Sequence, residues 1–230
     1  MKKLLLTALM LVLGLQALPA GAAAAAQPFV RWAVYSSEAQ NTPALFEAVT
    51  AYNNALQKSS GVLAVYGGED ENGVMRYLEI YKDEAACTAL QNNAGLQSAR
   101  AEIAKLANKT GILNAEAFLL QTKNSGTADK PRMAKLVIDP AQLDEYKKVL
   151  AKEMTASVTN EPGVLALLAT TETANPNVFH LLELYADDEA YKAHIAGPYF
   201  QEYNKAVQTM VTDKTLIVNK LQDVTLSGKI

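Results

Sequence analysis

The sequence repeats itself after about a hundred residues, and this internal duplication constrains the fold more than any other feature. Three matches occur in the same order: Arg-x-Ala at 31–33 and 132–134, Gly-Val-Leu-Ala at 61–64 and 163–166, and Glu-x-Tyr at 79–81 and 183–185. A repeat of this period indicates two similar structural units, each long enough to bury a small core. We therefore expect one unit at 29–121, a second at 132–226, and a polar linker at 122–131.

The periodicity of apolar residues predicts the same order of elements in both units. In the second unit, strands are expected at 133–138, 164–170, 178–185 and 215–224. Asp139-Pro140 is typical of a helix start, and Gly197-Pro198 separates two later helices. In the first unit, Asn72-Gly73 is typical of a hairpin turn. The order strand, helix, strand, strand, helix, strand is that of the ferredoxin-like fold, so the fold class is α+β.

A ferredoxin-like unit covers one face of its antiparallel sheet with helices and leaves the other face open. Two tandem units can bury both open faces by packing sheet to sheet within one chain. We therefore expect an intramolecular pseudo-dimer that forms a dimeric α/β barrel, and we leave open whether the chain forms a further homo-oligomer.

The first 26 residues have the pattern of a secretory signal peptide. Lys2 and Lys3 precede an apolar stretch from Leu4 to Leu18, and small residues with Ala-x-Ala spacing follow. The stretch is too short and wrongly flanked for a membrane-spanning helix. We expect cleavage within residues 22–27 and a mature protein that is periplasmic or secreted.

Charge and cysteine content narrow the classes of partner. Removing Lys2 and Lys3 from the 21 basic side chains leaves 19, against 24 acidic ones. This acidic balance argues against nucleic acid or a membrane surface as a partner. The lone Cys87 cannot form an internal disulfide and is expected to be a small buried residue. His180 and His194 lack the spacing of metal ligands, so no metal site is expected.

Two segments of the second unit carry recognisable motifs: "NEPGVLAL" at 160–167 and "NVFHLLELYADDEAYKAHIAGPYFQEY" at 177–203. In these segments the second unit is similar to the antibiotic biosynthesis monooxygenase (ABM) family, the dimeric α/β-barrel group that includes quinol monooxygenases. The matching residues are Pro162, Gly163, Phe179, Glu183, Tyr185, Ala190, His194, Pro198 and Phe200. Tyr199 stands where the family usually has a second histidine. The first unit matches more weakly: it keeps Gly61, Glu79, Tyr81 and Ala86 but loses the histidine, proline and aromatic residue.

This resemblance implies a monooxygenase that needs no cofactor and oxidises a quinol-like or phenolic small molecule with dioxygen. Two other interpretations stay open: a non-catalytic exported protein that binds a small aromatic ligand in the same barrel pocket, and an isomerase. Haem degradation is disfavoured, because haem-degrading relatives combine a tryptophan with an asparagine and a histidine. Trp32 has no matching asparagine nearby.

His194 is the leading catalytic candidate, and Tyr199 is the second. An imidazole with an ordinary pKa near 6.5 can accept a phenolic proton at neutral pH, which is the step that oxygenation without a cofactor requires. On a helix, His194 shares a face with Ala190 and Tyr191. Tyr199 could orient a substrate oxygen through its hydroxyl group.

Four further residues are candidates for substrate binding: Tyr191, Phe200, His180 and Glu183. Strand alternation places His180 on the face opposite Glu183, so a structural histidine on the sheet is an alternative for it. Glu183 and Tyr185 recur in the first unit as Glu79 and Tyr81. Because that unit lacks the histidine, each Glu-Tyr pair is expected to have a structural, hydrogen-bonded role.

Overall fold

The computed structural model describes residues 27–217, 219–220, 224–226 and 229–230. The predicted signal peptide at 1–26 lies outside these residues. In the first unit the elements are β1 (Phe29–Ser36), η1 (Ala39–Asn41), α1 (Thr42–Gln57), β2 (Val62–Asp70), β3 (Met75–Tyr81), α2 (Glu84–Gln91), α3 (Ala94–Leu106) and β4 (Lys109–Thr122). This order confirms the expected ferredoxin-like arrangement.

The second unit repeats the order. Its elements are β6 (Lys130–Ile138), η2 (Pro140–Gln142), α4 (Leu143–Asn160), β7 (Val164–Glu172), β8 (Val178–Tyr185), α5 (Asp188–Ala196), α6 (Pro198–Ala206), β9 (Val211–Ile217) and β10 (Asn219–Lys220). The short strand β5 (Thr127–Ala128) lies between the units and pairs with β11 (Val224–Thr225). The last long strand begins at Val211 and not at the predicted 215. The prediction placed it too late because residues 212–216 are exposed and lack the apolar alternation that marks a strand.

The two units share one curled antiparallel sheet. Within the described residues its strand order is β10-β2-β3-β1-β4-β7-β8-β6-β9, so each unit contributes a ferredoxin-like set of four strands. The sets join where β4 pairs with β7, with Ala115 opposite Glu172 and Thr122 opposite Ala166. At the other edge β10, which follows β9 in the chain, pairs with β2. Through this pairing the two ends of the sheet meet at β2, and the strands close a barrel within one chain.

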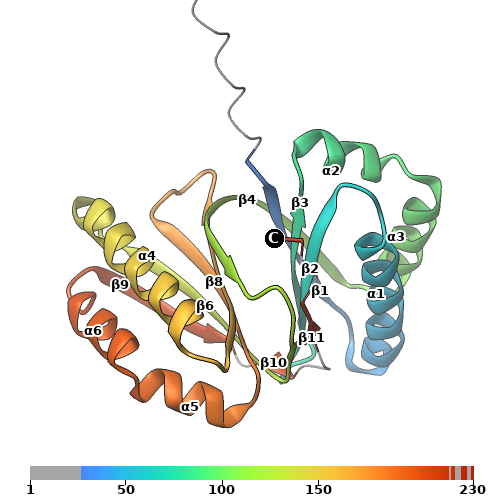
Figure 1. Cartoon of the computed structure of the whole chain (residues 1–230). Coiled ribbons are helices and arrows are strands. Elements are labelled where there is room, and N and C mark those ends of the chain that lie inside the picture. Colours follow the sequence, from blue (N-terminus) through green and yellow to red (C-terminus); the bar gives the residue numbers. More distant parts are fainter. Residues whose placement is uncertain (1–26, 218, 221–223, 227–228) are drawn as a thin grey trace, which may run out of the picture.

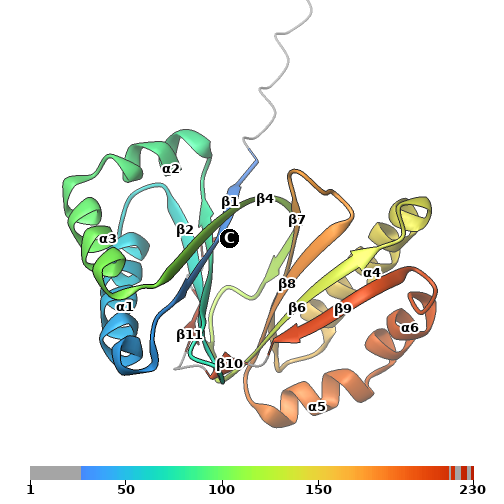
Figure 2. The same cartoon turned by 180° about the vertical axis from the view of Figure 1, so that it is seen from behind.

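Apolar side chains from both units fill the space between the two halves of the sheet. This core includes Val30, Trp32, Tyr66 and Leu78 from the first unit and Met133, Leu168, Leu182 and Leu184 from the second. Figures 1 and 2 show α1–α3 on one outer flank and α4–α6 on the other, with the strands between them. Each set of helices buries its own core against its half of the sheet. Among the described residues, no helix has the length and apolar character needed to cross a membrane.

The residues shared by the two copies serve the same local structure. Asp83 and Asp187 cap α2 and α5 by accepting hydrogen bonds from the backbone N–H groups of Ala86 and Ala190, at 2.7 and 2.8 Å. A Cβ atom added to Gly163 would lie 2.3 Å from the Cβ of Ala190. Glycine therefore allows α5 to pack closely on the start of β7.

Candidate active site

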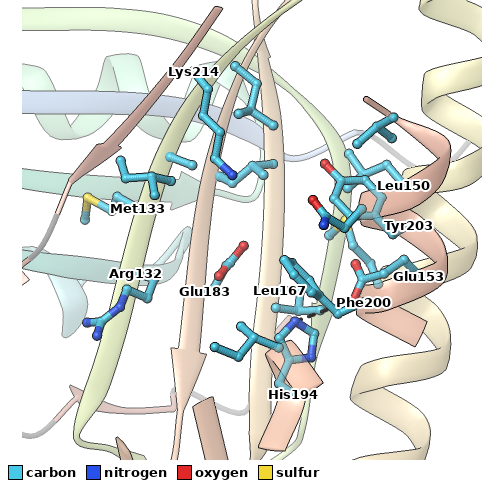
Figure 3. Close-up of a pocket in the computed structure, with 18 of the residues that line it drawn as sticks. Arg132, Met133, Leu150, Glu153, Leu167, Glu183, His194, Phe200, Tyr203 and Lys214 are labelled. Atoms are coloured by element: carbon cyan, nitrogen blue, oxygen red, sulfur yellow. Dashed lines mark ion pairs between the residues drawn. The ribbon is translucent and has the colours of Figure 1, made fainter. Parts of the chain in front are cut away.

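A cavity of about 440 Å³ lies in the second unit, between the helix-covered face of its sheet and helices α4, α5 and α6. Its walls are mainly apolar and include Leu150, Met154, Leu167, Leu181, Phe200 and Val207. Polar side chains also line it and include Arg132, Glu153, Glu183, His194, Tyr203 and Lys214 (Figure 3). An apolar cavity with a few converging polar groups is typical of a small-molecule site.

His194 occupies the last turn of α5, where two aromatic rings and a carboxylate contact its side chain. Its side chain is 2% exposed, and its ring packs 5.3 Å from the Tyr185 ring and 5.2 Å from the Phe200 ring. The Nδ1 atom lies 2.9 Å from Oε2 of Glu161, which caps the end of α4. Because a carboxylate accepts hydrogen bonds, Nδ1 carries the proton of the neutral ring. This leaves Nε2 as an acceptor.

Glu153 comes from the inward face of α4 and lies beside the free nitrogen of His194. Its Oε1 atom is 3.7 Å from Nε2 and accepts a hydrogen bond of 2.8 Å from the Ser157 hydroxyl. Burial raises the pKa of Glu153 to about 7; the Ser157 hydrogen bond opposes this shift, and the negative charges of Glu183 and Glu161 add to it. The site therefore holds a carboxyl group that can change protonation near neutral pH.

Glu183 projects from β8 into the cavity and accepts a hydrogen bond of 2.9 Å from the Tyr185 hydroxyl. Burial raises its pKa, an effect that the Tyr185 hydrogen bond and the nearby His194, Lys214 and Arg132 oppose. Figure 3 shows the Lys214 side chain from β9 directed toward Glu183, whereas the guanidinium group of Arg132 points away from it.

The structure brings four of the predicted residues to the cavity wall: His194, Tyr191, Phe200 and Glu183. His180 lies on the other face of β8, where its ring is 5.9 Å from that of Trp32 and its Nε2 atom is 2.9 Å from Glu172. Tyr199 is half-buried on α6, and its neighbour Phe200 lines the cavity. His180 and Tyr199 do not line the cavity, because neighbouring side chains on a strand or helix point in different directions. The expected hydrogen bond between Glu183 and Tyr185 is present, as is the one between Glu79 and Tyr81.

Sequence reasoning missed Glu153, Glu161, Arg132 and Lys214. A signal for Glu153 existed, because a carboxylate beside Leu150 and Met154 on the apolar stripe of a helix is unusual. Glu161 lies inside the segment that resembles the ABM family, but its partner is 33 residues further along the chain. Among the described residues, no cluster of three or more His, Cys, Asp or Glu side chains could hold a metal ion.

The second unit, which holds the cavity, matches a known protein family. The model of the antibiotic biosynthesis monooxygenase family matches residues 132–206. The chain belongs to this family. Its match spans β6 to α6, the elements that supply most of the cavity wall. Membership supports a monooxygenase-like function and leaves the substrate unspecified.

Solved structures resemble the ABM chain over one or both units. Two proteins described as a "putative monooxygenase", from Lactobacillus acidophilus and Fusobacterium nucleatum, each have a TM-score of 0.77 and 20% identity. The alignments cover 87% and 86% of this chain and 99% and 94% of theirs, so the fold similarity extends over both units. A "putative antibiotic biosynthesis monooxygenase" from Bacteroides thetaiotaomicron is 38% identical over 42% of this chain and 95% of its own, with a TM-score of 0.38. None of the curated proteins matches the chain.

Proposed function

We propose that this ABM protein is a cofactor-independent monooxygenase that oxidises a quinol-like or phenolic small molecule with dioxygen. One observation carries the proposal: His194 lies in an apolar cavity, with Nδ1 bound to Glu161 and Nε2 available as an acceptor. This arrangement resembles the orientation of a catalytic histidine by a carboxylate, which fixes the ring tautomer and stabilises the imidazolium ion.

In the proposed reaction, Nε2 of His194 accepts a proton from a substrate hydroxyl group. The resulting phenolate donates one electron to dioxygen, and the two radicals combine to form a carbon–oxygen bond. The peroxide then loses water, so that a quinol and dioxygen give a hydroxyquinone and one water molecule. The protein contributes binding, proton removal and exclusion of bulk water, because the substrate itself supplies the electrons.

The other groups in the cavity suit these steps. The aromatic rings of Phe200 and Tyr191 offer flat apolar surface to an aromatic substrate. When ionised, Glu153 lies close enough to Nε2 to stabilise the imidazolium ion, since the separation is 3.7 Å. The cavity volume of about 440 Å³ falls within the range of small-molecule sites.

Oxygen uptake in the presence of a chelator tests the proposal. A panel of hydroquinones and polyketide-type phenols is supplied with ¹⁸O-labelled dioxygen, and products are analysed by mass spectrometry. We expect at least one substrate to consume oxygen and to give a product with one added oxygen atom from dioxygen and two fewer hydrogens. Binding without oxygen uptake would instead support a non-catalytic binding protein, and a product of unchanged mass would indicate an isomerase.

A further inference from the structure

An arginine lies directly opposite the glutamate of the Glu-x-Tyr element in both units, on the neighbouring strand. Arg31 faces Glu79 across β1 and β3, and Arg132 faces Glu183 across β6 and β8. In the first unit the two side chains form a buried ion pair, and Glu79 is 0% exposed. Tyr81 donates a further hydrogen bond of 2.6 Å to the same carboxylate. The first unit is therefore closed at this position.

The second unit is open at the same position. The guanidinium carbon of Arg132 lies 4.5 Å from the centre of the Tyr191 ring, and Nη1 donates a hydrogen bond of 2.9 Å to the carbonyl oxygen of Pro131. Glu183 keeps the hydrogen bond from Tyr185 and borders the cavity. Figure 3 shows the gap between the Arg132 and Glu183 side chains.

Tyr191, which contacts Arg132, has no aromatic counterpart in the first unit. It is the fourth residue after the capping Asp187, and the fourth residue after Asp83 is Cys87. The Tyr191 ring packs edge-on against Tyr185 at 5.3 Å, which fixes its position beside Arg132. An aromatic face attracts a guanidinium group, and a cysteine offers no such surface. Tyr191 thus supplies the second unit with an alternative partner for the arginine.

We propose that Glu183 anchors a second hydrogen-bond-donating group of the ligand, a hydroxyl or amino group, and that Tyr191 is the positioning residue that keeps Glu183 available by holding Arg132 away. The identity of the first group, the hydroxyl that His194 deprotonates, rests on the proposed function. The ligand class is then a two-ended aromatic molecule such as a dihydroxyarene, with one oxygen at His194 and another polar group at Glu183.

The surroundings of Glu183 favour such a ligand. The titratable groups that act on it or on which it acts are Tyr185, His194, Lys214, Arg132, Glu153, Tyr146 and Tyr203. A carboxylate in an apolar wall gains most from an added donor, because few water molecules compete for it. If Arg132 paired with Glu183 as Arg31 pairs with Glu79, a ligand would have to separate two buried charges before binding.

The test compares Tyr191→Cys, which copies the first unit, with Tyr191→Phe, which keeps the aromatic face. The probes are 1,4-dihydroxynaphthalene and 1-naphthol, which lacks the second hydroxyl group, and binding is measured by calorimetry without oxygen. A hydrogen bond to a charged group makes the wild type prefer the diol by about 10-fold or more. We expect Tyr191→Cys to lose this preference and Tyr191→Phe to keep it.

A double variant separates the proposed role from simple damage to the fold. Tyr191→Cys with Arg132→Met removes the arginine that would close on Glu183, so the preference for the diol should return. Carboxyl ¹³C NMR gives a second measurement: the pKa of Glu183 should fall in Tyr191→Cys, because Arg132 approaches, and should rise again in the double variant.

The proposal is overturned if the wild type shows no preference for the diol, if Tyr191→Cys keeps it, or if the double variant fails to restore it. Because binding is measured without turnover, the result is independent of oxygenation. A protein that consumes no oxygen but shows the expected pattern of diol preference would contradict the proposed function and leave this inference intact.

Discussion

The two units share their fold and differ in what lies between helices and sheet. The buried positions of α1 and α4 follow the same spacing: Leu45, Val49, Tyr52, Asn53 and Leu56 in the first, Tyr146, Leu150, Glu153, Met154 and Ser157 in the second. Tyr52 thus stands where the second unit has Glu153. Counted from the capping aspartates, Leu90 and Leu96 stand where the second unit has His194 and Phe200. Tyr52, Leu90 and Leu96 pack into the core of the first unit, whereas Glu153, His194 and Phe200 line the cavity of the second.

This difference shows that closing the barrel and forming a site are separable tasks. Both units have a Gly–Ala approach that lets a helix pack closely on the sheet, an aspartate cap at the start of that helix, and a Glu–Tyr hydrogen bond within one strand. The cavity depends instead on a few side chains on α4, α5 and α6. Both units of the duplicated chain complete the barrel, and the first unit contributes packing. The variants below test this division between barrel closure and site formation.

The largest effect is expected for His194→Ala, which removes the proposed general base. General acid–base catalysis contributes about 10²–10⁴-fold, so turnover per folded molecule should fall by that factor. His194→Gln should be almost as damaging, because an amide cannot accept the proton at neutral pH. Steady-state oxygen uptake on the substrate found in the panel measures both.

Leu90→Ala in the first unit is the matched control for His194→Ala. Leu90 is half-buried, so its truncation should lower the free energy of unfolding by about 1–2 kcal/mol and leave turnover unchanged. If His194→Ala keeps wild-type turnover, His194 is not the general base, and its difference from Leu90 has no catalytic role.

The arginines should differ in their contribution to stability. Arg31→Met leaves Glu79 as an unpaired buried carboxylate and should lower the free energy of unfolding by about 3–5 kcal/mol. Arg132→Met removes a contact with the Tyr191 ring and should cost about 1 kcal/mol or less. Urea unfolding at pH 7 compares the two. Equal losses would indicate that Glu79 and Glu183 depend on their arginines to the same extent.

Glu153→Gln should change the pH dependence of stability. The pKa of Glu153 is about 7 in the folded chain and 4.5 as an ordinary carboxyl, so the folded state binds the proton more tightly. The linked stability is fully present below pH 4.5 and is lost as the pH rises through 7. At pH 8 to 9, Glu153→Gln should therefore exceed the wild type by up to about 3 kcal/mol, with little difference at pH 4 to 5. Unfolding curves that stay parallel over this range would contradict the raised pKa.

Several features could be predicted because they depend on residues close together in sequence. The period-two and helical patterns located most elements, Gly197-Pro198 marked the break between α5 and α6, and Cys87 proved buried at 2% exposure. β9 was placed too late, because its exposed side chains carry no apolar alternation. The boundaries at 122 and 131 stay predictions, as does the role of the first 26 residues.

The site was predictable in part for the same reason. Tyr191 and His194 share one face of α5, so a helical pattern could group them, and Phe200 follows within ten residues on α6. Glu153 and Glu161 come from α4, and Lys214 comes from β9. Their convergence on His194 and Glu183 depends on how α4 and β9 pack against the sheet, which no local pattern encodes.

The sequence by itself determined the duplicated ferredoxin-like fold, since repeated glycines, caps and apolar periodicity act on nearby backbone and leave few alternatives. It also placed a histidine where the first unit has a leucine. The tertiary structure alone decided that Arg31 binds Glu79 whereas Arg132 rests on Tyr191. The physical reason is that a long, flexible cationic side chain takes whichever partner lies within reach. For Arg132 that partner is on α5, about sixty residues away along the chain.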